Sequence, residues 1–169
     1  MKRTKVLTGV LGGAAIGAAV LAGYPESGGS GAPPSIEGTY RLVMRELPDG
    51  TVLRAPEIDG LLTFTRQYRN MNAYWTTSDG EVHSISSIAR YTINDENYSE
   101  ENIHFLVFNS ADQPVRDAER NTATARVERD GEAVTFDLPL RGEMRLTFKN
   151  RTITASREGE FIDHWQRVE

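Results

Sequence analysis

Hydrophobic and polar residues alternate along most of the chain beyond residue 36. In the segment 39–45, Tyr40, Leu42 and Met44 fall on one face. A period of two is the side-chain period of a β-strand, and the helical period of 3.6 residues hardly occurs. The same alternation predicts nine further strands, at residues 61–65, 70–76, 82–92, 103–109, 122–129, 133–138, 143–148, 152–156 and 161–168.

The segments between these strands carry turn signals. Asp and Gly tolerate a positive φ, so an Asp-Gly pair between apolar segments predicts a tight hairpin turn. Residues 110–121 form the longest polar break, for which we predict a loop with one helical turn. Four Asp-Gly pairs and one weaker turn predict antiparallel neighbours: Asp49-Gly50, Asp59-Gly60, Asp79-Gly80, Asp130-Gly131 and Lys149-Asn150-Arg151.

Ten strands in one domain are too many for an open sheet that does not curl. Closing the sheet removes its exposed edges. We therefore predict an all-β fold, an antiparallel up-and-down β-barrel of about eight to ten strands. A β-sandwich is the alternative that the pattern leaves open.

The N-terminal segment reads as an export signal. Lys2, Arg3 and Lys5 precede an uncharged run over residues 6–23 that ends in small side chains. This is the layout of a secretory signal peptide, so we expect residues 1–22 to be a signal peptide cleaved after Ala22. The alternative is an uncleaved membrane anchor. Residues 23–35, rich in Gly, Pro and Ser, are predicted to be a flexible linker before a domain at 36–169. The domain would be periplasmic or secreted, or tethered to a membrane by residues 6–23.

The charge and the cysteine content exclude several classes of function. The chain has 24 acidic against 19 basic residues and a formal net charge of −5, and it contains no cysteine. An acidic surface repels phosphate backbones, so we predict no nucleic-acid partner, and membrane contact only through the N-terminal segment. The absence of cysteine excludes disulfides, thiolate metal sites and cysteine nucleophiles.

The first predicted strand and its surroundings resemble a known family. Residues 36–43 (IEGTYRLV) are similar to the G-x-W-x-L-V opening of the lipocalin-like, calycin-type barrels, with Tyr40 in place of the family's Trp. An Asp-Gly loop at 48–50, a strand at 60–65 and Trp165 near the last strand follow in a similar order. The resemblance implies an antiparallel barrel whose interior holds one small hydrophobic or amphipathic ligand. A barrel filled by its own side chains is the alternative.

Alternation also predicts which side chains point into the barrel. The expected lining is aromatic and aliphatic, which suits an apolar ligand but equally an ordinary core. The candidate cavity residues are Tyr40, Leu42, Met44, Leu62, Phe64, Met71, Trp75, Ile85, Tyr91, Phe105, Phe136 and Phe148.

Sites for metals and catalysis have little support in the sequence. His83, His104 and His164 occupy three predicted strands without metal-ligand spacing, so we predict no metal and no cofactor. Residues 94–102 are polar, but adjacent acidic residues point to opposite faces of a strand or stay solvated on a loop, which argues against an acid/base pair. Asp163 and Glu37 are expected to meet Arg41 or Arg167.

We therefore expect an exported binding protein for a small hydrophobic or amphipathic molecule. One alternative is a small barrel isomerase or cyclase that uses Tyr40, Tyr91 and His83. The other is a filled-core envelope protein that meets a protein partner through its outer face or the loop at 110–121.

Overall fold

The computed structural model describes residues 35–77, 79–110, 112–142 and 144–168. The expected signal peptide at 1–22 and residues 23–34 of the expected linker lie outside this range. The described residues form thirteen β-strands and no helix: β1 (Gly38–Glu46), β2 (Val52–Leu53), β3 (Ile58–Phe64), β4 (Tyr68–Thr76), β5 (Val82–Ile93), β6 (Asn97–Asn109), β7 (Val115–Asp117), β8 (Thr122–Arg126), β9 (Glu128–Asp130), β10 (Ala133–Leu138), β11 (Met144–Lys149), β12 (Thr152–Arg157) and β13 (Phe161–Arg167).

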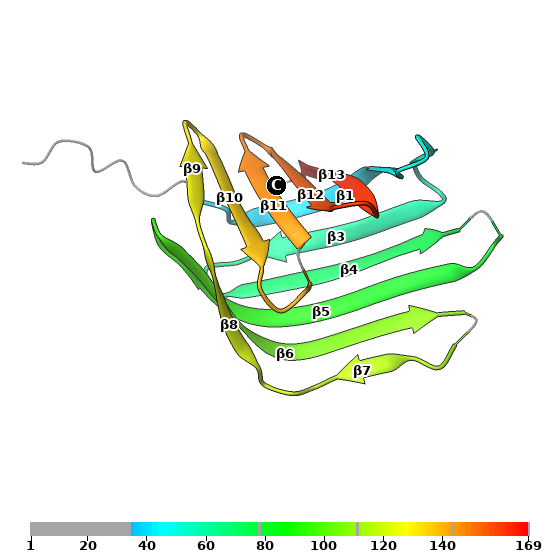
Figure 1. Cartoon of the computed structure of the whole chain (residues 1–169), viewed down its shortest axis with the longest axis horizontal. Coiled ribbons are helices and arrows are strands. Elements are labelled where there is room, and N and C mark those ends of the chain that lie inside the picture. Colours follow the sequence, from blue (N-terminus) through cyan, green and yellow to red (C-terminus); the bar gives the residue numbers. More distant parts are fainter. Residues whose placement is uncertain (1–34, 78, 111, 143, 169) are drawn as a thin grey trace, which may run out of the picture. The chain divides into compact units, whose positions relative to one another are not determined.

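All strands belong to one antiparallel sheet that curls into a half-barrel (Figure 1). Its order is β7-β6-β5-β4-β3-β1-β13-β12-β11-β10-β9, and the two remaining strands lie off this path, β2 beside β1 and β8 beside β6. β13 returns to pair with β1. The predicted strand at 122–129 is two strands: β8 pairs with β6, and β9 pairs with β10. Only Val127 separates β8 from β9. Residues 122–130 therefore pair with β6, near one end of the strand order, and with β10, near the other end.

Most of the predicted turns are present, and two of the predictions for the loops are wrong. Gly50, Gly80 and Gly131 have φ values of 84°, 88° and 57°, and they stand in the turns that follow β1, β4 and β9. The prediction of a turn at Asp59-Gly60 is wrong, because both residues lie inside β3. Glycine is needed there for another reason: a Cβ on Gly60 would lie 2.8 Å from the Cβ of Ala73 on β4.

The predicted helical turn in residues 110–121 is also wrong. Residues 115–117 form β7, which pairs with residues 105–107 of β6 and covers part of that edge. Strand pairing satisfies backbone groups that a helical turn would leave open on β6.

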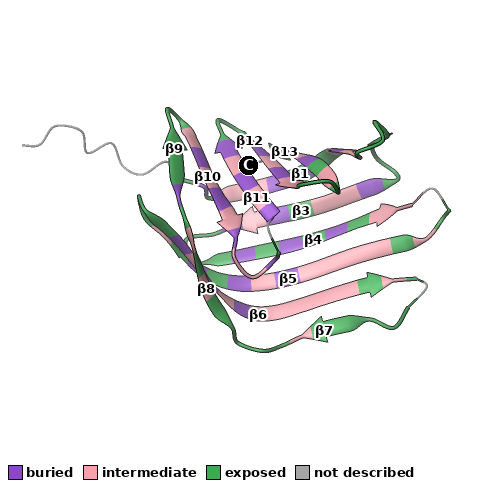
Figure 2. Cartoon of the chain, viewed as in Figure 1, coloured by how far each residue is buried: buried purple, intermediate pink, exposed green. Residues whose placement is uncertain are grey.

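Burial alternates along the strands, as expected for a sheet with one face toward a core (Figure 2). A β-bulge between Leu42 and Met44 interrupts this pattern in β1. After a bulge the following side chains change face. Consequently Arg45 is buried, at 6% exposed, and Met44, which the alternation places on the inner face, is only half-buried.

Six aromatic rings fill the end of the interior where β1 begins and β3 ends. Phe148 lies 5.3 Å from Phe64 and 5.5 Å from Phe136, and Phe136 stacks on Tyr98 at 4.2 Å between ring centroids. Such pairs add to the burial of apolar area. We call these rings the aromatic cluster: Tyr40, Phe64, Tyr91, Tyr98, Phe136 and Phe148.

Candidate functional site

A cavity of about 280 Å³ lies in the interior, lined by residues of β1, β3–β5 and β10–β13. None of the aromatic-cluster residues line it. Its walls are mostly apolar, with four charged side chains. The apolar lining consists of Leu47, Leu62, Met71, Ala73, Trp75, Ile85, Leu138, Met144, Leu146, Ala155, Phe161 and Trp165, and the charged lining of Arg45, Arg157, Glu160 and Asp163.

Small residues leave this space open. Ala73 on β4 faces Gly60 on β3, and Ala155 on β12 faces Leu146 on β11. Ala73 and Ala155 line the cavity, and each carries only a methyl group where a larger side chain would fill it. The aromatic cluster has large rings at its inward positions, so that end is filled and this end is hollow.

A buried ion pair forms one wall of the cavity. Nε and Nη2 of Arg45 donate to the two carboxylate oxygens of Asp163 at 2.6 and 2.8 Å, and both side chains are almost fully buried. The guanidinium carbon lies 4.5 Å from the ring centroid of Trp75 and 4.3 Å from that of Phe161. The two rings and the carboxylate hold the guanidinium in one orientation. Burial raises the pKa of Asp163, and Arg45 and His164 oppose that rise.

A second ion pair lies at the edge of the cavity. Arg157 Nη1 donates to Glu160 at 3.1 Å, and its Nε and Nη2 donate to the backbone carbonyls of Gly142 and Arg141. These bonds tie the β12–β13 turn to the loop after β10. All three guanidinium nitrogens of Arg157 are therefore in use.

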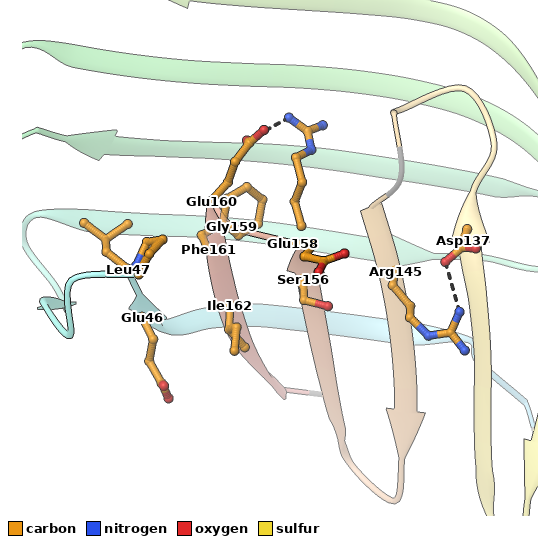
Figure 3. A pocket seen from close by; sticks show the side chains of 12 residues that line it. Glu46, Leu47, Asp137, Arg145, Ser156, Glu158, Gly159, Glu160, Phe161 and Ile162 are labelled. Carbon is orange, nitrogen blue, oxygen red and sulfur yellow. Dashed lines mark hydrogen bonds and ion pairs between the residues drawn. The ribbon is translucent and has the colours of Figure 1, made fainter.

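A wider groove of about 550 Å³ lies beside this edge (Figure 3). Leu47, Arg157, Glu160 and Phe161 line both the groove and the cavity. Figure 3 shows Asp137 and Arg145 on neighbouring strands at the other side of the groove. The shared residues make this the place where the cavity and the groove meet.

A further polar cluster is buried beside the aromatic cluster. Arg69, fully buried, donates to Glu100 at 3.0 Å and to Ser87 at 2.9 Å. The hydroxyl of Tyr98 donates to the same Glu100 oxygen at 2.9 Å. The sequence missed this cluster because β6 begins at Asn97 and not at residue 103, which places Tyr98, Glu100 and Asn102 on the inner face.

Arg141 reaches this cluster from the loop between β10 and β11. Its Nη2 donates to Asn102 at 2.5 Å, and its guanidinium carbon lies 4.0 Å from the Phe105 ring centroid. Among the described residues, three buried polar atoms have no hydrogen-bond partner: Oε1 of Glu100, Nε of Arg141 and Nε1 of Trp165. Of these residues only Trp165 lines the cavity.

The twelve candidate cavity residues are divided among five places. Leu62, Met71, Trp75 and Ile85 line the cavity. Leu42 is buried in the core, Met44 is half-buried after the bulge, and Phe105 lies beneath Arg141. The remaining five belong to the aromatic cluster: Tyr40, Phe64, Tyr91, Phe136 and Phe148.

The ion pairs also differ from expectation. Asp163 does meet an inward arginine, but the partner is Arg45. Arg41 points outward and binds Asp59 through two bonds, of 3.1 and 2.9 Å. Alternation from Tyr40 predicts Arg45 on the outer face, and only the bulge reverses this, so no local sequence signal identifies the inner pair.

The groups considered for catalysis are engaged elsewhere. The hydroxyls of Tyr40 and Tyr91 donate to the backbone carbonyls of Ile36 and Thr65, and burial raises the pKa of both. His83 stacks on Trp75, and His164 bonds Glu46 at 2.8 Å. Within the described ranges, no three His, Asp or Glu side chains are grouped so that they would hold a metal ion.

The part of the chain that the structure describes contains no helix of the length and apolarity that crossing a membrane requires. Comparisons with protein-family models, curated proteins and solved structures give no match.

Proposed function

We propose that residues 36–169 form a lipocalin-like β-barrel that binds one small hydrophobic or amphipathic molecule in its interior, and that the N-terminal segment directs its export. The single observation that carries this proposal is the interior cavity of about 280 Å³. Ligand pockets commonly hold about 300–1,000 Å³, and this cavity of about 280 Å³ lies just below that range, which favours a small ligand. The bonds of β8 to β6 and of β9 to β10 support a closed barrel around it.

The charges in the cavity favour an uncharged ligand. Its two arginines are each paired with a carboxylate, Arg45 with Asp163 and Arg157 with Glu160. The lining therefore carries no net charge, and the rest of it is apolar. A charged ligand would lose its hydration without gaining an unpaired counter-ion.

Access to the cavity is expected from the groove beside it. Leu47 and Phe161 are apolar and line both spaces, so a ligand in the groove meets apolar side chains before it enters. The Arg157–Glu160 pair lies at the same boundary. Small displacements of these side chains would open the passage without moving the sheet.

The two tryptophans make a direct test possible. Trp75 and Trp165 are the only tryptophans of the chain, and both line the cavity. We expect N-phenyl-1-naphthylamine, a neutral apolar dye, to bind with one-to-one stoichiometry and to accept excitation energy from tryptophan. Ala73→Leu, which fills part of the cavity, should weaken binding at least about tenfold, or by about 1.4 kcal/mol.

Leu61→Phe is the matched control. Leu61 is 50% exposed, so the larger side chain adds volume outside the cavity. It should bind the dye as the unchanged protein does. Absence of dye binding, or equal binding by Ala73→Leu and the unchanged protein, would refute the proposed function.

A further inference from the structure

The cavity lining includes a guanidinium nitrogen that donates to none of the described residues. Arg45 donates to Asp163 through Nε and Nη2, and its Nη1 makes no hydrogen bond to a described residue. Arg157, the other arginine of the lining, uses all three of its nitrogens. Arg45 Nη1 is not among the buried polar atoms that lack a partner, so this N–H group is open to an acceptor on a ligand.

A second unused donor belongs to the same lining. The indole Nε1 of Trp165 is buried and has no partner among the described residues. In the register of β1 and β13, Trp165 pairs with Leu42 and Asp163 pairs with Arg45. Nε1 of Trp165 is enclosed, so Nη1 of Arg45 is the donor that a ligand can reach, and the complementary group on the ligand is an acceptor.

The surroundings of Arg45 fix where its donor points. Trp75 and Phe161 contact the guanidinium at 4.5 and 4.3 Å, and Asp163 holds one edge through two bonds. A donor that is already held in place loses little conformational entropy when it binds an acceptor. The guanidinium is therefore preorganised for one polar atom.

The acceptor should be uncharged. A ligand carboxylate at Nη1 would be a second anion on a cation that Asp163 already neutralises, in a mostly apolar cavity. Two carboxylates that share one site disfavour each other's ionisation. A carbonyl, ester or ether oxygen accepts the same hydrogen bond without adding charge.

From this geometry we infer that the cavity recognises an apolar molecule that bears one neutral oxygen acceptor, such as a ketone or ester, and that Nη1 of Arg45 binds that oxygen. This inference rests on the proposed function. It adds the chemical class of the ligand and the residue that selects it.

The test compares nonan-2-one with 2-methylnon-1-ene, which has the same shape but a methylene group in place of the oxygen. Each displaces the dye from the protein, and the quantity of interest is the ratio of their affinities. Arg45→Met/Asp163→Leu removes the donor without leaving a buried charge. We expect this variant to lower the ketone-to-alkene ratio at least about tenfold, the effect of one hydrogen bond to a charged group.

Arg41→Met/Asp59→Leu is the matched control, because this pair has the same two-bond geometry on the outer face. Its ratio should equal that of the unchanged protein. Circular dichroism checks the fold of each variant. An equal ratio in the inner and outer double variants would overturn the inference while the dye-binding result still stands.

A single substitution gives an independent test should the inner double variant not fold. Asp163→Asn leaves the charge of Arg45 without a counter-ion. Binding of nonanoate should then rise at least about tenfold relative to the unchanged protein. Nonanoate that binds the unchanged protein more tightly than nonan-2-one would also overturn the inference, whereas a protein that binds no probe refutes the proposed function itself.

Discussion

The two ends of the interior follow the same alternating pattern but differ in packing. At one end, Phe64, Phe136 and Phe148 meet ring to ring, with centroids 5.3–5.5 Å apart. At the other end, Ala73 and Ala155 leave a cavity of about 280 Å³. The same sheet thus provides a close-packed core and a hollow. The volume of the inward side chains contributes to the difference, because alanines at the hollow end stand where the other end has rings.

Each end also has a buried arginine–carboxylate pair. Arg69 and Glu100 are completely enclosed, with both side chains at 0% exposed. Arg45 and Asp163 are at 7% and 5%, and both line the cavity. A group beside a cavity can be solvated by a water or a ligand when it loses its partner, whereas an enclosed group cannot.

The largest expected effect follows from breaking the enclosed pair. Glu100→Ala leaves the charge of Arg69 buried without a counter-ion, so we expect a loss of about 3–5 kcal/mol in the free energy of unfolding. Asp163→Ala should cost less, about 1–3 kcal/mol, because water can reach Arg45 through the cavity. Urea denaturation followed by circular dichroism measures both.

Glu101→Ala is the control, because Glu101 is the next residue on β6 and pairs with Arg120 on the surface at 3.0 Å. Its cost should stay within about 1 kcal/mol. Equal losses for Glu100→Ala and Asp163→Ala would show that the two ends are equally dry, and the comparison would then fail.

A smaller effect is expected when the same substitution is made at each end. Ala89 is fully buried on β5, between Arg69 and Asn102 in the register of the sheet. Ala89→Leu should cost about 1–3 kcal/mol, because the added atoms must displace packed neighbours. Ala73→Leu places them in the cavity, so its cost should be under about 1 kcal/mol.

Thermal unfolding of the two variants side by side measures this difference. A cavity already occupied by side chains would give Ala73→Leu a cost as large as that of Ala89→Leu. The result therefore tests the hollow end without any ligand.

Alternation and turn chemistry were enough to predict most of the fold. Nine of the ten predicted strands are present, and the tenth, at 122–129, is divided into β8 and β9. The turns at Gly50, Gly80 and Gly131 are where Asp-Gly pairs indicate them, because both signals depend on neighbouring residues alone. Asp59-Gly60 carries the same local signal and lies within β3. Glycine is required at position 60 because Ala73 on the neighbouring strand leaves no room for a Cβ atom. A signal from adjacent residues cannot reveal such a contact.

The residues of the site were harder to predict, because they too depend on contacts between residues that lie far apart in the sequence. Four of the twelve candidate residues line the cavity, because alternation gives the face of a side chain but not whether its end of the strand lies beside the cavity. Arg45 was missed because a one-residue bulge reverses the face of everything that follows it. Glu100 was missed because its strand begins with polar residues, and the burial of polar groups depends on a partner, here Arg69, far away in the sequence.

The smallest expected effect is a difference in carboxyl pKa between the Arg45–Asp163 pair beside the cavity and the Arg41–Asp59 pair on the outer face. Burial raises the pKa of Asp163 against the opposing effects of Arg45 and His164, whereas the hydrogen bond from Arg41 lowers the pKa of Asp59. As the pH falls, Asp163 should therefore take up its proton before Asp59. Carbon-13 NMR of the side-chain carboxyl groups, assigned with Asp163→Asn and Asp59→Asn, measures the order.

The contributions of Asp163 and Asp59 to the free energy of unfolding should depend on pH in opposite directions. A raised folded-state pKa means that the contribution of Asp163 is fully present below its unfolded-state pKa and is lost as the pH rises through the folded-state pKa. A lowered pKa means that the contribution of Asp59 is present above its unfolded-state pKa and is lost as the pH falls. Asp163→Asn should therefore gain stability relative to the unchanged protein as the pH rises above about 3.9, the unfolded-state pKa of an aspartate, and Asp59→Asn should gain it as the pH falls below that value. If Asp163 titrated together with or below Asp59, burial beside the cavity would have no measurable effect, and the cavity end would have to be as well hydrated as the outer face.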